Sequence, residues 1–156
     1  MEIQLIIGPN NSGKSLHAET LAVEHQNAPL YYLATMVPQN DENLQRIEKH
    51  KRQRAGKGFH TIEEPWDIQD LVIPSDSVVL LEDASNLLAN GIFIHHADGE
   101  ECLQRIFTLA EKCKTLIIVS IAGLIPEYDE ETNHYIRELN SLNQALEKAA
   151  SECIRF

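Results

Sequence analysis

Residues 8–15 read GPNNSGKS, which fits the GxxxxGK[ST] spacing of a phosphate-binding loop, or P-loop. Phosphate oxygens need several backbone N–H groups that converge on one point, and a tight loop running into a helix N-terminus supplies them. Lys14 would reach the β- and γ-phosphates, and the Ser15 hydroxyl would join water and phosphate oxygens around Mg²⁺. The pattern predicts ATP or GTP binding; the alternative is an ordinary glycine turn. The predicted loop residues are Gly8, Pro9, Asn10, Asn11, Ser12, Gly13, Lys14 and Ser15.

Two acids, Glu82 and Asp83, follow the apolar residues 77–81. In a P-loop protein, an acid at the end of a later strand orients Mg²⁺, often through water, close to the loop serine. Because neighbouring strand residues point to opposite faces, we expect one of the two acids to point into the site. The alternative is that both are solvated acids at a strand end, or that they cap the next segment.

Positive charge is concentrated in residues 46–54, RIEKHKRQR, of an otherwise acidic chain. If this segment is helical, Arg46, His50 and Arg54 share one face because they are four residues apart. The neighbouring cations disfavour protonation of His50, and a neutral imidazole is a competent nucleophile. The segment therefore indicates a polyphosphate-binding face with a candidate nucleophile. The alternative is a solvated basic helix with an incidental histidine.

Composition restricts the classes of protein that remain. The 156 residues are 43% hydrophobic, and we expect residues 1–156 to form a single domain with one core. The 24 acidic and 13 basic residues give a formal net charge of −11, which argues against a nucleic-acid partner. Small anions remain possible ligands at a local basic site.

The remaining compositional signals concern location and cysteine use. The N-terminus lacks a signal-peptide pattern, and no window is apolar enough for a membrane span, so we expect a cytoplasmic protein. Cys102, Cys113 and Cys153 have no metal-ligand spacing, which indicates buried or idle thiols and neither disulfides nor ligands.

Apolar runs alternate with amphipathic segments along the whole chain. Near-continuous apolar strands separated by helices are typical of a parallel sheet covered on both faces. We therefore predict a three-layer α/β P-loop fold of the RecA-like kind with a mainly parallel sheet. Strands are predicted at residues 3–7, 30–34, 59–62, 77–81 and 115–121. Helices are predicted at residues 15–25, 41–54, 65–71, 101–112 and 133–150.

Five elements of the first two thirds of the chain together resemble one enzyme family. They are GPNNSGKS at 8–15, YYLATM at 31–36, DENLQRIEKHKRQR at 41–54, FHTIEEP at 59–65, and LLED at 80–83 with the downstream Asn90. In this order they resemble the bifunctional adenosylcobinamide kinase / adenosylcobinamide-phosphate guanylyltransferase family of cobalamin biosynthesis. Five elements in order are much more specific than the P-loop alone.

The resemblance implies two reactions on a corrinoid substrate. Family members use ATP or GTP to phosphorylate adenosylcobinamide, and they then transfer GMP from GTP to that phosphate through a guanylylated histidine. His50 occupies the position of this histidine, so the resemblance implies His50 and Lys14 as catalytic residues and Ser15 and Glu82 as contacts of Mg²⁺. It also implies nucleotide contacts by Arg46, Arg54, Glu63 and Glu82. Self-association into a homo-oligomer is expected from the family.

Departures from the family pattern define the alternatives. Pro9 and Asn11 replace a glycine and an arginine of the family's loop, and the segment after residues 115–120 is shorter than in the family. Comparison of this sequence with the family pattern also predicts that the chain ends before the family's last strand. One alternative is a diverged nucleotide-binding paralogue without cobinamide chemistry, and another is a P-loop kinase for a different small alcohol. Whether His50 reaches the nucleotide of its own chain or of a neighbouring subunit is left open by the sequence.

Overall fold

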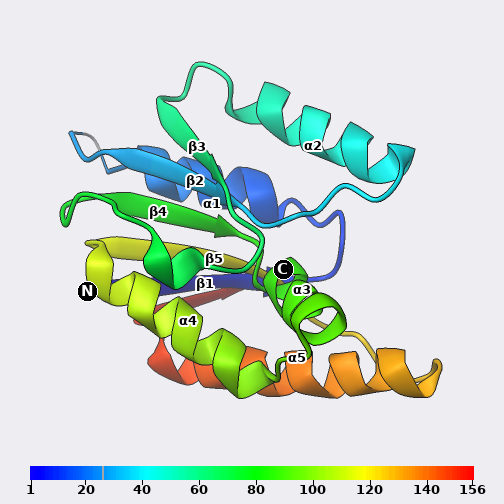
Figure 1. Cartoon of the computed structure of the whole chain (residues 1–156). Helices are drawn as coiled ribbons and strands as arrows, with labels where there is room; N and C mark the ends of the chain where they lie inside the picture. The colour runs from blue at the N-terminus through cyan, green and yellow to red at the C-terminus, as the bar shows by residue number, and fades with distance from the viewer. Residues whose placement is uncertain (26) are drawn as a thin grey trace.

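In the part of the chain that the structure describes, residues 1–25 and 27–156, six strands form one parallel sheet. The structure is a computed structural model, and its strand order is β3-β2-β4-β5-β1-β6 (Figure 1). The strands are β1 (Glu2–Gly8), β2 (Leu30–Ala34), β3 (Phe59–Glu63), β4 (Val78–Glu82), β5 (Thr115–Ile121) and β6 (Glu152–Arg155). The helices are α1 (Lys14–Val23), α2 (Asp41–Arg54), α3 (Ala84–His95), α4 (Gly99–Lys112) and α5 (Glu130–Ala149). The predicted α/β class with a parallel sheet is confirmed.

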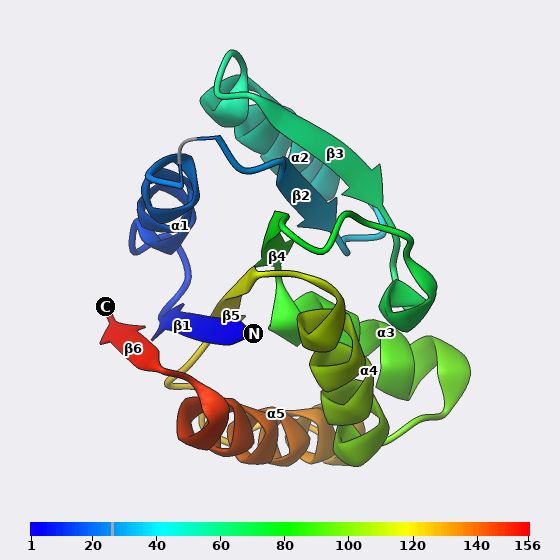
Figure 2. The same cartoon turned by 90° about the vertical axis from the view of Figure 1, so that its left-hand side faces the viewer.

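Helices cover both faces of the sheet, which gives the three predicted layers (Figure 2). α1 packs against β1, β4 and β5 on one face, whereas α3, α4 and α5 pack together on the other. Strand residues alternate between these two cores, so that Leu80 packs with α1 and Leu81 packs on the opposite side. Burial on both faces explains why the strands read as continuous apolar runs. The same alternation turns Glu82 toward the α1 face.

Helix α3 is an element that the sequence did not predict. Its residues Asn90 and Gly91 have low helix propensity, but tertiary contacts compensate. The Asn90 amide donates to the carbonyl oxygens of Thr35 (2.8 Å) and Pro65 (2.9 Å). Gly91 lets Trp66 pack directly against the helix, because a Cβ there would lie 2.5 Å from the indole ring. Both residues therefore serve contacts that become visible only once the chain is folded.

Other helix boundaries differ modestly from the prediction. The helix predicted at residues 65–71 is only a short 3-10 turn at Ile68–Asp70. The helix predicted from residue 133 begins earlier, at Glu130, because the Asp129 side chain caps it by accepting from the Thr132 N–H at 2.7 Å. Among the described residues, no helix is long and apolar enough to cross a membrane.

The C-terminal residues form the edge strand β6 (Glu152–Arg155), which the sequence analysis did not predict. β6 pairs in parallel with β1. The Ser151 N–H donates to the Ile3 carbonyl and the Phe156 N–H donates to the Ile7 carbonyl, both at 2.8 Å. This pairing satisfies backbone groups that β1 would otherwise expose as an edge strand. It also brings Phe156 next to the P-loop.

The three cysteines are free thiols, two of which are buried. Burial raises the pKa of Cys102 to about 12 and the pKa of Cys113 to about 11, so neither thiol ionises near neutral pH. Cys153 is half-buried in β6. The prediction of buried thiols is confirmed for the first two.

Candidate nucleotide-binding active site

A cavity of about 540 Å³ lies at the carboxyl ends of β2 and β4. The P-loop, α2 and the ends of these two strands line it. Parallel α/β sheets bind ligands at this edge, and the volume is in the range of small-molecule sites. The segment with the candidate nucleophile and the P-loop therefore face one cavity within a single chain.

Most residues that the sequence predicted for the site line this cavity. Gly8 and Pro9 do not. The Pro9 carbonyl instead accepts hydrogen bonds from the Ser12 hydroxyl and the Lys14 ammonium, both at 2.7 Å, and so shapes the loop from within. The predicted residues on the cavity wall are Asn10, Asn11, Ser12, Gly13, Lys14, Ser15, Arg46, His50, Arg54, Glu63 and Glu82.

Helix α1 begins without the side-chain cap that the other four helices have, within the described part of the chain. Its N-cap is Gly13, which adopts a left-handed φ of 91° and makes no side-chain cap hydrogen bond. The other caps are Asn40, Asp83, Asp98 and Asp129. The first N–H groups of α1 are therefore left for a ligand at the positive end of the helix dipole. This is the arrangement with which proteins bind phosphate.

Lys14 is held inside the loop and is only 7% exposed. Burial lowers the pKa of its ammonium, whereas the carboxylates of Asp83 and Glu82 act in the opposite direction. Asn11, which replaces the family's arginine, has a φ of 57°, a left-handed conformation that asparagine tolerates better than most residues. The loop thus keeps the lysine but has no second cation at the position of Asn11.

Gly8 has a packing role that can be tested. A Cβ at Gly8 would lie 2.7 Å from the Cβ of Phe156, so either β6 or the loop must shift. We expect Gly8→Ala to lower the free energy of unfolding in urea by about 1–3 kcal/mol. Gly99→Ala is the matched control, because its added Cβ would come no closer than 3.4 Å to the Glu138 carboxylate. Equal stability of the Gly8 variant and the wild type would contradict the packing role.

Glu82 is buried at the end of β4 and faces the P-loop side of the sheet. The Tyr32 hydroxyl, from the neighbouring strand β2, donates to Glu82 Oε2. Burial raises the pKa of the Glu82 carboxyl, and the nearby hydroxyls of Ser15 and Tyr32 lower it. The hydrogen bond from Tyr32 connects the strand-end acid to β2, and Glu82 lines the same cavity as the loop serine.

Asp83 has a different role, since its side chain caps α3. The carboxylate accepts hydrogen bonds from the Asn86 N–H at 2.7 Å and from the Ser85 hydroxyl at 2.8 Å. The Asp83 N–H in turn donates to the buried Thr35 hydroxyl at 3.0 Å. Both acids therefore line the cavity, and Asp83 in addition caps α3.

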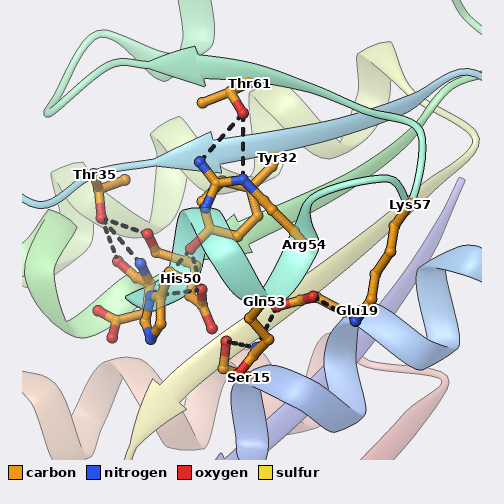
Figure 3. Close-up of polar contacts among 11 residues, drawn as sticks. Ser15, Glu19, Tyr32, Thr35, His50, Gln53, Arg54, Lys57 and Thr61 are labelled. Atoms are coloured by element: carbon orange, nitrogen blue, oxygen red, sulfur yellow. Dashed lines mark hydrogen bonds and ion pairs between the residues drawn. The ribbon is translucent and has the colours of Figure 1, made fainter. Parts of the chain in front are cut away.

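The imidazole of His50 is oriented by these same buried groups (Figure 3). Its Nδ1 lies 3.4 Å from Glu82 Oε2 and 3.3 Å from the Tyr32 hydroxyl. With the proton on Nδ1, the ring donates to the carboxylate and the Nε2 lone pair is left for the cavity. Burial is the main cause that lowers the pKa of His50, and the Arg46 guanidinium adds to it. The sequence predicted this direction from the like charges alone, which are the smaller cause.

The two predicted arginines lie differently in the cavity. Arg54 is buried, stacks over the Tyr32 ring at 3.8 Å and donates to the Thr61 hydroxyl at 3.3 Å (Figure 3). Arg46 is half-buried one turn before His50 and lines the cavity wall. Glu63, the last residue of β3, is exposed at the rim. Arg54 thus supports the aromatic ring beneath His50, while Arg46 presents charge to the cavity.

Sequence reasoning missed three polar residues of this region. Tyr32 was counted as part of a buried strand, and Glu19 and Gln53 as helix residues without a role. Gln53 donates to the Ser15 hydroxyl at 3.3 Å and to the Glu19 carboxylate (Figure 3). Only strand alternation could have placed Tyr32 on the face of Glu82, and only if the pairing of β2 with β4 had been known.

The donor set fits a magnesium ion that is shared with a nucleotide. Among the described residues, no group of three or more His, Cys, Asp and Glu side chains could hold a metal ion by itself. Ser15 and Glu82 nevertheless offer a hydroxyl and a carboxylate on the wall of the same cavity, beside the P-loop. Mg²⁺ prefers such hard oxygen donors and usually keeps water and phosphate oxygens as its other ligands.

Comparison with known proteins identifies a family and a fold. The family described as cobinamide kinase / cobinamide phosphate guanyltransferase matches residues 4–156, well beyond the first two thirds that carried the resemblance. No curated protein sequence gives a significant match. The crystal structure of the flagellar accessory protein FlaH from Methanocaldococcus jannaschii is similar, with a TM-score of 0.54 and 15% identity over 99% of this chain and 70% of that chain. At this identity the likeness shows the fold alone, and it supports the predicted P-loop architecture.

Proposed function

Because the chain belongs to the cobinamide kinase / cobinamide phosphate guanyltransferase family, we propose that it phosphorylates adenosylcobinamide and transfers GMP from GTP to the resulting phosphate. The observation that carries this proposal is the position of His50. Its Nδ1 lies 3.4 Å from Glu82 in a cavity that the P-loop also lines. A protein that only binds nucleotide needs the P-loop but has no use for an oriented imidazole.

In the kinase step, the hydroxyl oxygen of adenosylcobinamide attacks the γ-phosphorus of ATP or GTP. A new O–P bond forms, the bond from the γ-phosphorus to the bridging oxygen breaks, and the nucleoside diphosphate leaves; the hydroxyl proton passes to solvent. Lys14 and the uncapped N–H groups of α1 stabilise the charge that develops on the phosphate oxygens. These groups come from the P-loop and α1 alone.

In the guanylyl-transfer step, the Nε2 lone pair of His50 attacks the α-phosphorus of GTP. An N–P bond forms, the bond to the bridging oxygen breaks, and pyrophosphate leaves. Glu82 stabilises the cationic ring through its contact with Nδ1. An oxygen of cobinamide phosphate then attacks the same phosphorus, the N–P bond breaks, and His50 returns to its neutral form.

Ser15 and Glu82 are the residues that would hold Mg²⁺ beside the nucleotide. The ion, when bound, supplies positive charge that offsets the charge of the phosphate oxygens. Ser15 contributes its hydroxyl from the first turn of α1, and Glu82 contributes its carboxylate from the end of β4.

Product analysis tests the proposal directly. The protein with Mg²⁺ and ATP or GTP is expected to convert adenosylcobinamide to its phosphate, and with GTP to convert that phosphate to the GDP derivative. Liquid chromatography with mass detection separates these products. Nucleotide binding without either product would overturn the proposal in favour of a nucleotide-binding paralogue. Phosphorylation of another small alcohol alone would favour a kinase of different specificity.

A further inference from the structure

Helix α2, which carries His50, is held to the rest of the molecule mainly by polar contacts. Of its fourteen residues, all of which the structure describes, Arg54 alone is buried, and Leu44 is 51% exposed. Figure 1 shows α2 at the upper edge of the molecule, above β2 and β3. Hydrophobic burial therefore contributes little to fixing the position of His50.

A buried carboxylate on α1 helps to attach α2 to the rest of the molecule. Glu19 is fully buried, and a buried charge requires partners. Its partners come from the end of α2 and the loop behind it: the Gln53 amide donates to one carboxylate oxygen, and the Lys57 ammonium lies 3.0 Å from the other (Figure 3). We call Glu19, Gln53 and Lys57 the Glu19 latch.

The latch joins the same two helices that meet at the phosphate site. Glu19 lies one turn after Ser15 on α1, and Gln53 lies one turn after His50 on α2. Gln53 also donates to the Ser15 hydroxyl at 3.3 Å, so a single amide contacts both the loop serine and the latch carboxylate. The latch therefore joins the helix that carries His50 to the helix that begins at the P-loop.

We propose that the Glu19 latch positions His50 over the P-loop, which makes Glu19 and Gln53 positioning residues that affect guanylyl transfer more strongly than the kinase step. This inference rests on the proposed function. The kinase groups lie on the P-loop and α1, which the hydrophobic core holds through Ala18 and Ala22. The nucleophile, in contrast, depends on α2. A displacement of about 1 Å in a reacting group can cost about 100-fold in rate.

Exchanging the side chains of Glu19 and Gln53 gives a test in which the second substitution should restore the activity that the first one removes. Gln53→Glu places two carboxylates against each other, whereas Glu19→Gln together with Gln53→Glu restores one amide facing one carboxylate. We expect Gln53→Glu to slow formation of the covalent GMP adduct at saturating GTP by about 100-fold, and the double variant to recover to within about threefold of wild type. The kinase rate should fall by a clearly smaller factor than adduct formation, because Gln53 contacts the kinase groups only through the Ser15 hydroxyl. Gln45→Ala, on the exposed surface of α2, is the matched control.

The outcomes separate the latch from the proposed chemistry. An unchanged adduct rate in Gln53→Glu, a parallel fall of both activities, or a double variant as slow as Gln53→Glu would overturn the latch. If the wild type forms no adduct, the proposed function fails, and hydrogen–deuterium exchange of residues 41–54 still decides the latch. Faster exchange in Gln53→Glu with recovery in the double variant supports it, and unchanged exchange contradicts it.

Discussion

Replacing His50 with alanine is expected to abolish guanylyl transfer while leaving the kinase step intact. The substitution removes the only nucleophile that the proposed mechanism uses for GMP, so we expect the rate of GDP-cobinamide formation to fall by at least about 10⁴-fold. The kinase step uses Lys14 and the P-loop, and its rate should stay within about threefold of wild type. Separate assays of the two products measure both effects.

His134→Ala is the control for loss of a histidine as such, because His134 is exposed on α5 and does not line the cavity. It should leave both activities unchanged. A His50→Ala protein that still transfers GMP at more than about a hundredth of the wild-type rate would contradict the nucleophile assignment. A protein that loses both activities together would indicate that His50 supports the site as a whole.

Replacing Lys14 with alanine is expected to impair both steps. Lys14 is the P-loop cation and contributes its charge to every phosphate that passes through the cavity, so kcat/KM should fall by about 10²–10³-fold for the kinase and for guanylyl transfer alike. The Lys14 ammonium donates to the Pro9 carbonyl of the same loop, which is a local contact, so thermal unfolding should shift little.

Lys148→Ala provides the matched control for the lysine, since Lys148 is exposed near the end of α5. Activity loss in one step only would contradict a shared phosphate site. If the kinase activity alone were lost, GTP for guanylyl transfer would bind at a site other than the P-loop. Together, the His50 and Lys14 variants separate the nucleophile from the phosphate-binding machinery.

Local signals made a large part of this fold predictable. The P-loop is a contiguous motif, and the strands β4 and β5 read as uninterrupted apolar runs because both of their faces are buried. Alternation along β4 places its last residue, Glu82, on the same face as Leu80. These inferences needed no knowledge of which strands are neighbours.

Other features depend on tertiary contacts and could not be read from the sequence. The hydrogen bond from Tyr32 to Glu82 exists because β2 pairs with β4, which lies far away in the chain. Helix α3 contains Asn90, a poor helix former whose amide serves distant carbonyls. The placement of α2 over the P-loop of its own chain depends on the buried Glu19, whose partners lie more than thirty residues away.

Intact-protein mass spectrometry after incubation with GTP and Mg²⁺ tests the central claim most directly. We predict an acid-labile GMP adduct on the wild-type protein, located by peptide mapping to α2, and its absence from His50→Ala. A protein that binds GTP, shown separately by calorimetry, and yet carries no adduct would contradict the claim that this site transfers GMP through His50.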